Sequence, residues 1–343
     1  RALSGARPRW AGPFGHNACM ALGEFDLIAR YFTRPTRQAV LGVGDDCALL
    51  QPRPGHWLAV STDMLVEGRH FLSTVAPERL GHKALAVNLS DLAACGATPL
   101  AFTLALAMPR VDEVFLAGFS RGLLELADAH DIELVGGDTT AGPLNLCITV
   151  FGEVPVGQAL RRDGAQAGDR LWVSHPHDRG IGDARLALEV FRGQVALPSE
   201  DFEQVRAAME LPQPRVALGQ ALRGVASSAI DLSDGLVGDL SHVLQRSRVG
   251  ATLAVDELPC SPWLARQAPA LRHECLFSGG DDYELLFTAA DEAAVQRAAA
   301  EAVQAEEDHH RLAVADGPGE AECDLAHHEG GAVAGDHGLD GLA

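Results

Sequence analysis

The chain has 343 residues, which is enough for two domains that each bury a hydrophobic core. Its formal net charge of −20 argues against a nucleic-acid or anionic-membrane surface, because both need clustered Lys and Arg. Lys83 is the only lysine, so the lysine-containing phosphate loop of P-loop enzymes is excluded, and the protein-kinase motifs are missing as well.

The seven cysteines form neither Cys-x-x-Cys pairs nor a zinc-site spacing. They are typical of reduced, buried, small hydrophobic residues, which predicts a cytoplasmic protein. No apolar run reaches the roughly 18 residues that a membrane span needs. Residues 1–19 are rich in Arg, Gly and Pro and lack the apolar stretch of a secretory signal, so we expect a disordered extension ahead of Met20.

The first half of the chain alternates helical and strand patterns. Helical periodicity is found at 24–32, 77–94 and 111–130. Strand patterns are found at 39–43, 47–50, 57–61, 99–107, 132–135 and 144–154. The tripeptide Pro155-Val156-Gly157 marks a domain boundary. We therefore expect an N-terminal α/β domain over residues 20–155.

The second half continues the alternation. Strand patterns are found at 171–174, 229–232, 252–255 and 283–288. Helical patterns are found at 183–191, 200–209, 216–222 and 236–246. These predict a C-terminal α+β domain over residues 156–303. Residues 304–343 are rich in Asp, Glu, His and Gly, and we expect a divergent tail with little ordered structure.

Aspartates recur along the chain in short clusters flanked by Gly, Ser or Thr. The clusters read Gly44-Asp45-Asp46, Ser61-Thr62-Asp63, Asn88-Leu89-Ser90-Asp91, Gly136-Gly137-Asp138, Asp231-Leu232-Ser233-Asp234-Gly235 and Gly279-Gly280-Asp281-Asp282. Most follow an apolar, β-branched run, so we expect them where a strand gives way to a loop. Carboxylates gathered there repel one another, and divalent cations relieve that repulsion. The pattern predicts a multi-metal site for a phosphorylated ligand.

Each of these elements also has a purely structural interpretation. A single Gly-Asp pair can be an ordinary turn, and Asp45 can be a cap rather than a ligand. On sequence alone, His70 fits a structural histidine. Lys83 precedes an apolar helical face, where a solvated or capping role is the simpler expectation and a phosphate contact is the alternative. Joint occurrence of the clusters favours the metal site.

Seven motifs, in order along the chain, together resemble the thiamine-monophosphate kinase family. They lie at 23–28, 42–48, 61–71, 83–97, 136–140, 230–236 and 278–285. The resemblance implies a superfamily shared with aminoimidazole-ribonucleotide synthetase and selenophosphate synthetase. In that superfamily an N-terminal α/β domain pairs across a homodimer, and ATP lies in the cleft between this domain and a C-terminal α+β domain.

The implied reaction is direct, Mg²⁺-assisted, in-line transfer from ATP to thiamine monophosphate, giving thiamine diphosphate. The acceptor phosphate is already ionised at neutral pH, so no general base is needed. The reaction still requires that the charges of two polyanions be neutralised and that the two substrates be aligned. Several Mg²⁺ ions, together with positioning by the protein, meet these requirements. The near absence of lysine is consistent with metals in that role.

The resemblance also assigns individual residues. It assigns the metal ions to Asp46, Ser61, Thr62, Asp63, Asp91, Asp138, Asp231 and Asp234. It assigns ATP to Gly137, Asp138, Arg162 and Ser233. His70 and Asp281 match substrate-contacting positions, where Glu is common in place of Asp281.

Two stretches depart from the family's pattern. The loop at 174–180 reads Ser-His-Pro-His-Asp-Arg-Gly where the family usually has Thr-Gly-x-Leu-Gly, and no aromatic residue follows Phe287, although the family carries one near its C-terminus. The alternative function is therefore a catalytically impaired Mg·ATP-binding homologue with a sensing or structural role.

Overall fold

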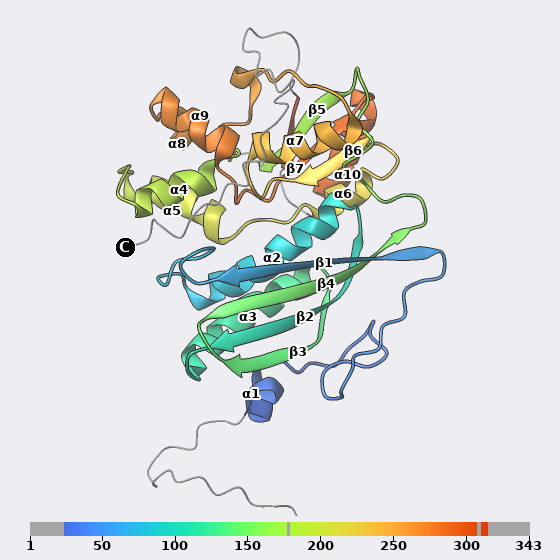
Figure 1. Ribbon diagram of the computed structural model, residues 1–343, viewed down its shortest axis with the longest axis vertical. Helices are drawn as coiled ribbons and strands as arrows, with labels where there is room; N and C mark the ends of the chain where they lie inside the picture. Colours follow the sequence, from blue (N-terminus) through green and yellow to red (C-terminus); the bar gives the residue numbers. More distant parts are fainter. Residues whose placement is uncertain (1–23, 177–178, 307–309, 315–343) are drawn as a thin grey trace, which may run out of the picture.

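The computed structural model describes residues 24–176, 179–306 and 310–314. The extension predicted over residues 1–19 and most of the predicted tail lie outside these ranges. Within them the chain forms two four-stranded sheets with their helices, one from each half of the sequence (Figure 1). The predicted two-domain organisation, α/β followed by α+β, is confirmed.

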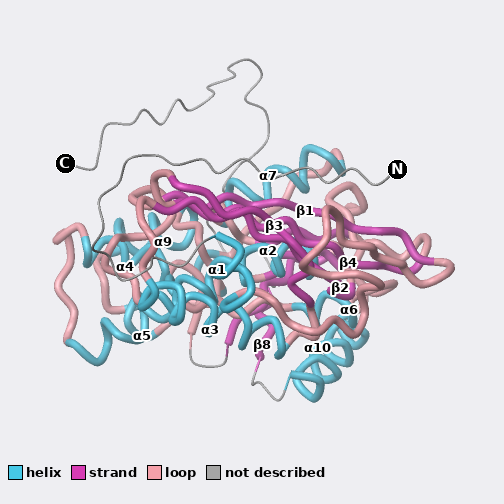
Figure 2. Tube along the Cα trace, turned by 90° about the horizontal axis from the view of Figure 1, so that it is seen from below, coloured by secondary structure: helices cyan, strands magenta, loops and turns pink. Residues whose placement is uncertain are grey.

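The first sheet has the strand order β1-β4-β2-β3. Its strands are β1 (His56–Val66), β2 (Thr98–Met108), β3 (Glu133–Ala141) and β4 (Asn145–Pro155). Strands β2 and β3 run parallel, whereas β4 is antiparallel to both β1 and β2. Helices α2 (Pro77–Ala94) and α3 (Glu113–Ala129) cover one face of this sheet, and α1 (Glu24–Tyr31) packs against α3 and β3 (Figures 1 and 2).

Alternation along β1 separates the two faces of this sheet. Leu65 points toward the helices and is buried, whereas Leu58, Val60 and Met64 are 45%, 55% and 54% exposed on the opposite face. That opposite face, called the outer face below, therefore presents a row of apolar side chains to solvent. Such a row is unusual for a protein surface that has no partner.

The second sheet is antiparallel, with the order β6-β7-β5-β8. Its strands are β5 (Arg170–Pro176), β6 (Ser228–Asp231), β7 (Leu285–Ala289) and β8 (His310–Val314). The helices of this half are α4 (Asp183–Phe191), α5 (Ser199–Glu210), α6 (Val216–Ala221), α7 (Leu236–Ser247), α8 (Pro262–Ala265), α9 (Pro269–Ser278) and α10 (Glu292–Glu306), with a short 3₁₀ turn η1 (Val255–Glu257).

Helix α2 joins the two halves. It contacts β1 and β4 on one side and α6, β6 and β7 on the other, and Figure 1 shows it between the two sheets. Every residue from 83 to 90 is buried, which no helix with a solvated face achieves. The apolar, Ala-rich sequence of this stretch thus reflects a helix enclosed by both domains.

Most predicted elements are confirmed, and the helices at 77–94 and 183–191 match to the residue. The strands predicted at 39–43 and 47–50 are wrong, because this segment forms only isolated bridges such as Leu41 with Leu49. Only part of its apolar residues pack: Ala39, Ala48 and Leu50 join a small cluster with residues of the first sheet, whereas Val40 and Leu49 are 64% and 52% exposed. The strand predicted at 252–255 is also wrong, since the chain there leads into η1.

Two parts of the predicted tail are ordered. Residues 304–306 complete α10, and β8 pairs with β5 in the second sheet. The described cysteines are all unpaired, and Cys47, predicted to be buried, is exposed. Among the described helices none is long and apolar enough to cross a membrane.

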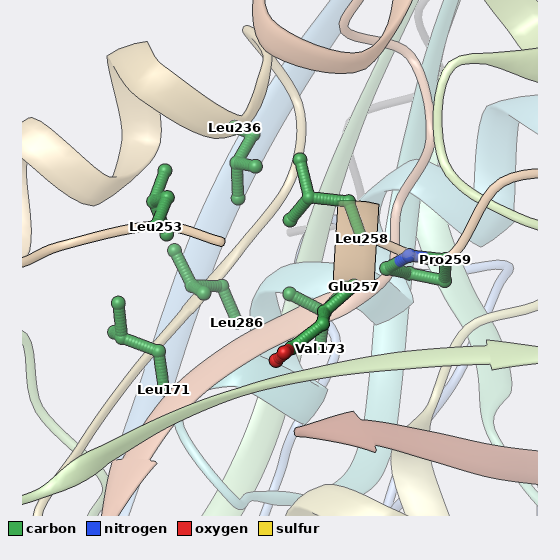
Figure 3. A pocket seen from close by; sticks show the side chains of 8 residues that line it. All are labelled: Leu171, Val173, Leu236, Leu253, Glu257, Leu258, Pro259 and Leu286. Atoms are coloured by element: carbon green, nitrogen blue, oxygen red, sulfur yellow. The ribbon is translucent and has the colours of Figure 1, made fainter. Parts of the chain in front are cut away.

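A small pocket in the second domain lies beside β5 and β7 (Figure 3). It is lined by Leu171, Val173, Leu236, Leu253, Glu257, Leu258, Pro259 and Leu286. Because seven of these eight residues are apolar, the pocket lacks the convergent polar groups that orient a ligand, and we interpret it as a packing gap.

Candidate active site at the domain interface

The aspartates predicted at strand ends occupy several kinds of position. Asp63 and Asp138 lie inside β1 and β3, and Asp91 lies in α2. The strand-end expectation is wrong for Asp63 and Asp138, because both strands continue for three residues after the aspartate, whereas Asp91 lies in the helix predicted at 77–94. Only Asp231 ends a strand, β6, and Asp234 follows in the turn before α7.

Strand β1 and helix α2 are joined by polar contacts around Asp63. The Asp63 backbone N–H donates to Oδ1 of Asn88 at 3.1 Å, and the Asn88 amide donates to the Ala84 carbonyl at 2.9 Å. The Ser61 hydroxyl donates to Oδ2 of Asp91 at 2.5 Å. Asp63 and Ser61 both lie on the helix-facing side of the strand, so α2 brings their polar groups together with Asp91.

The opposite side of α2 reaches the second domain at Asp231. The Ser90 hydroxyl donates to Oδ2 of Asp231 at 2.8 Å, and Ser90 and Asp231 are 0% and 4% exposed. Consecutive residues of one helix thus serve both domains, since Asp91 bonds to β1 while Ser90 bonds to β6. This places the domain interface inside the predicted site.

The electrostatics show that four carboxylates share one region. Burial first, and then the charges of Asp91 and Asp234, raise the pKa of Asp63 to about 6. Burial and Asp91 raise the pKa of Asp231 to about 7. Asp63, Asp91, Asp231 and Asp234 are called the carboxylate cluster below.

Arg162 opposes part of this repulsion. Burial raises the pKa of Asp91, while the Ser61 hydrogen bond and the charge of Arg162 lower it. Arg162 belongs to the segment that enters the second domain, and its backbone carbonyl accepts the Ser247 hydroxyl at 3.0 Å. The residue predicted to bind ATP therefore lies beside the carboxylate cluster.

The cluster fits a divalent cation only as part of a larger coordination shell. Within the described ranges, no three His, Cys, Asp or Glu side chains converge closely enough to hold a metal ion alone. Mg²⁺ is characteristically held by one or two carboxylates together with substrate phosphates. Asp63, Asp91 and Asp231, whose pKa values are raised mainly by burial, are donors that gain from such an ion. The donor set fits Mg²⁺ in the presence of a phosphorylated ligand.

A second group of side chains lies next to the cluster and consists of His70, Lys83, Asp281 and Tyr283. Lys83 does not have the solvated role expected from the sequence, because it is 3% exposed and its Nζ lies 2.5 Å from Oδ2 of Asp281. Nδ1 of His70 accepts the Val66 N–H at 3.0 Å. Burial, Arg69 and Lys83 lower the pKa of His70, and Asp281 opposes them.

Tyr283 connects the two groups. Burial raises the pKa of Tyr283 well above its usual value, and the charges of Asp281, Asp63 and Asp231 act in the same direction. Ser233 also belongs here, because its carbonyl accepts the Asp281 N–H at 2.8 Å. The predicted residues that the structure brings together are Ser61, Asp63, His70, Asp91, Arg162, Asp231, Ser233, Asp234 and Asp281.

Four predicted residues lie elsewhere in the chain. Thr62 and Asp138 are on the outer face, where the Thr62 hydroxyl lies 2.9 Å from that of Thr149. Asp46 is exposed, and its N–H bonds to the side chain of Asp45. Their assignments to metal or ATP stay predictions.

The fourth of these residues, Gly137, has a structural reason to be glycine. Its φ is +148°, and a Cβ added there would lie 1.8 Å from the carbonyl oxygen of Leu104. The parallel approach of β3 to β2 therefore requires glycine at this position, whatever its role toward ATP.

The sequence did not assign Asn88, Ser90 or Tyr283 to the site, and it offered a phosphate contact for Lys83 only as the alternative to a solvated role. The signal was present for two of them, because Asn88 and Ser90 flank Leu89 on a helix and residues two apart point to different sides. A polar pair at that spacing in the otherwise apolar stretch 84–90 indicates two partners. No comparable signal exists for Tyr283, whose place depends on the fold of the loop before β7.

Comparison with known proteins agrees with this arrangement. The family models for the N-terminal and C-terminal domains of AIR synthase related protein match residues 44–154 and 166–320. Thiamine-monophosphate kinase of Escherichia coli strain K12 is 48% identical over 274 residues, which cover 78% of this chain and 83% of that protein.

Two solved structures are similar along most of the chain. The crystal structure of thiamine-monophosphate kinase from Stenotrophomonas maltophilia K279a has a TM-score of 0.73 and 43% identity, and the match covers 85% of this chain and 93% of that one. The structure of AaThiL complexed with AMPPCP and TMP has a TM-score of 0.63 and 30% identity, and covers 70% of this chain and 77% of that one.

Proposed function

The chain belongs to the thiamine-monophosphate kinase family of AIR synthase related proteins, and on that premise we propose that it transfers the γ-phosphoryl group of ATP to thiamine monophosphate. The observation that carries the proposal is the carboxylate cluster where α2 meets the second domain, in which Asp231 is buried and Asp63 and Asp91 are partly buried. A relative of 30% identity complexed with AMPPCP and TMP supports the same pair of substrates.

The transfer needs no proton acceptor on the protein. An ionised oxygen of the substrate phosphate forms the new bond to the γ-phosphorus, while the bond to the β–γ bridging oxygen breaks and its electrons leave with ADP. Bound Mg²⁺ would neutralise phosphate oxygens as charge redistributes between the two polyanions. Asp63, Asp91, Asp231 and Asp234 are the residues that would hold it.

The cationic and polar groups around the carboxylate cluster are suited to binding the two substrates. Arg162 has a planar fork of donors suited to a phosphate of ATP, and its charge acts on Asp91. Ser233 lies against Asp281, so the loop predicted for ATP and the residue predicted for the substrate are held together. We assign His70 and Asp281 to the substrate and Arg162 and Ser233 to ATP.

We also propose a homodimer that pairs through the outer face of the first sheet. Leu58, Val60 and Met64 on β1 are about half exposed there, and an apolar row of this kind is stabilised by a partner surface. A cytoplasmic location is supported by the described cysteines, which are all unpaired.

The test is product analysis by mass after incubation with Mg·ATP and thiamine monophosphate. We expect thiamine diphosphate and ADP in equal amounts and no product in excess EDTA. Thiamine in place of its monophosphate is the matched control and should not react. Tight binding of Mg·ATP without any product would replace the proposal with the catalytically impaired homologue.

A further inference from the structure

The chain's only lysine is a buried cation at the domain interface. Lys83 projects from α2, is 3% exposed, and pairs with Asp281 of the second domain at 2.5 Å. Burying an ammonium group is unfavourable unless a partner of opposite charge lies against it. Among the described residues, Asp281 is the hydrogen-bond acceptor that the structure gives to Lys83.

Asp281 is held from several directions at once. Its backbone N–H donates to the Ser233 carbonyl at 2.8 Å, and its side chain hydrogen-bonds with that of Tyr283. Asp281 and Tyr283 have φ values of +64° and +54°, in the left-handed region that non-glycine residues rarely adopt. Backbone strain of this kind persists only where the surroundings over-determine the conformation, and it concentrates at functional sites.

The pair also lies on the side of the site assigned to the substrate. Both Lys83 and Asp281 act on the imidazole of His70, the other residue assigned to thiamine monophosphate. An ionised carboxylate offers about four acceptor positions, so Asp281 keeps capacity for a ligand after bonding to Lys83 and Tyr283. A carboxylate fixed in one orientation loses little conformational freedom when the ligand arrives.

We propose that Lys83 is a positioning residue for the phosphate acceptor: by pairing with Asp281 across the domain interface, it holds that carboxylate oriented toward thiamine monophosphate. The inference rests on the proposed function. It concerns substrate affinity, so it predicts a change in KM for one of the two substrates.

The experiment compares Lys83→Met, Lys83→Arg and Arg79→Met. Met matches the length of Lys without its charge, whereas Arg keeps the charge. Arg79→Met is the matched control, because Arg79 also projects from α2 into the second domain, where its Nη1 lies 2.9 Å from Glu210.

For Lys83→Met we expect KM for thiamine monophosphate to rise at least tenfold, with KM for ATP within about twofold of wild type. Lys83→Arg should recover part of the affinity, and Arg79→Met should leave both KM values near wild type. An equal rise in both KM values for Lys83→Met, or the same pattern in Arg79→Met, would overturn the proposal in favour of a general role in domain packing.

Lys83→Met leaves the Asp281 charge unpaired, and the variant protein can fail to fold for that reason. The double variant Lys83→Met/Asp281→Asn removes both charges and is expected to fold while keeping the raised KM. A wild-type KM in the double variant overturns the proposal. A wild-type protein that makes no thiamine diphosphate overturns the proposed function itself, whereas an active wild type with an unchanged Lys83→Met overturns only the role of Lys83.

Discussion

The surroundings of Asp63 disfavour its ionised form, because burial and the charges of Asp91 and Asp234 raise its pKa to about 6. Replacing it by Asn removes both the repulsion and a metal ligand. We expect Asp63→Asn to lower turnover by at least ~100-fold, while the melting temperature without Mg²⁺ stays the same or rises. Turnover assays and thermal unfolding measure the two effects.

Asp128→Asn is the matched control for this change. Asp128 lies on α3, is exposed, and pairs with Arg34 on the surface, away from the carboxylate cluster. Asp128→Asn should change neither the turnover nor the melting temperature, since exposed ion pairs contribute little to stability. Full activity in Asp63→Asn would remove this residue from the metal site.

Glu133 supports the segment that leads to Asp46. Its carboxylate accepts the backbone N–H groups of Arg37, Gln38 and Ala39 at 2.5, 3.0 and 3.1 Å. Burial by itself raises the pKa of Glu133, but these hydrogen bonds and the charge of Arg37 outweigh burial and lower the pKa below its usual 4.5.

A lowered folded-state pKa fixes the sign of the pH effect. The stabilisation by Glu133 is fully present above the unfolded-state pKa and is lost as the pH falls through the lower folded-state pKa. We expect Glu133→Gln to reduce the free energy of unfolding by about 1–2 kcal/mol at pH 7. Urea unfolding of both proteins from pH 7 down to acid should show this gap closing, and a gap that widens toward acid would contradict the assignment.

Helices α2 and α3 pack so closely that a side chain at Gly122 has no room. A Cβ there would lie 1.9 Å from the backbone carbonyl oxygen of Glu78, and a backbone atom cannot turn aside as a flexible side chain can. We expect Gly122→Ala to destabilise the protein by about 1–3 kcal/mol or more, measured by urea unfolding.

Gly238 provides the opposite case on α7. The nearest atom to an added Cβ there is Cβ of Asp234 at 3.9 Å, which is ordinary contact. Gly238→Ala should therefore stabilise by up to about 1 kcal/mol through helix propensity. Equal effects of the two substitutions would mean that α2 and α3 separate easily.

Helices and strands were predicted correctly where the apolar residues of an element all lie on one face that packs against the rest of the protein. The helix at 183–191 is an example. The prediction failed at 39–50, where the chain forms only isolated bridges: Ala39, Ala48 and Leu50 pack in a small cluster, but Val40 is 64% exposed. Helix α10 was missed because its buried stripe consists of Val295 and the alanines 298, 299 and 302, which give the right spacing but little hydrophobic contrast.

The assembly of the whole molecule is tested at the outer face. Val60→Asp introduces a charge in the middle of the apolar row on β1, and a two-fold interface would contain it twice. We expect the dimer to dissociate at least ~10-fold more readily, because buried unpaired charges oppose association. Sedimentation over a range of concentrations measures this.

Val114→Asp is the control, since Val114 is 83% exposed at the start of α3 and does not belong to the outer face. Both variant proteins should unfold at the wild-type temperature when monomeric. Identical sedimentation of both variants and wild type would place the dimer surface elsewhere or exclude it.

The residues that make up the site could be predicted only in part, because several of their contacts are set by the assembled fold and not by the local sequence. Recurring aspartates indicated the carboxylate cluster, because like charges concentrate only where a ligand needs them. The separation of Asp138 from Asp63 depends on strand register and on which face each residue takes, and both are properties of the assembled sheet. The pairing of Lys83 with Asp281 links residues 198 positions apart and leaves no local pattern.

The enclosure of α2 by both domains also bears on how the protein is made. During synthesis α2 is complete at Ala94, but its partners β6 and β7 end only at Asp231 and Ala289. At about 5–20 residues per second, that delay is roughly 10–40 s for the later strand. Until then the apolar surface of α2 that packs on the second domain is exposed on the nascent chain. We therefore expect ribosome-associated chaperones to bind the N-terminal half during synthesis.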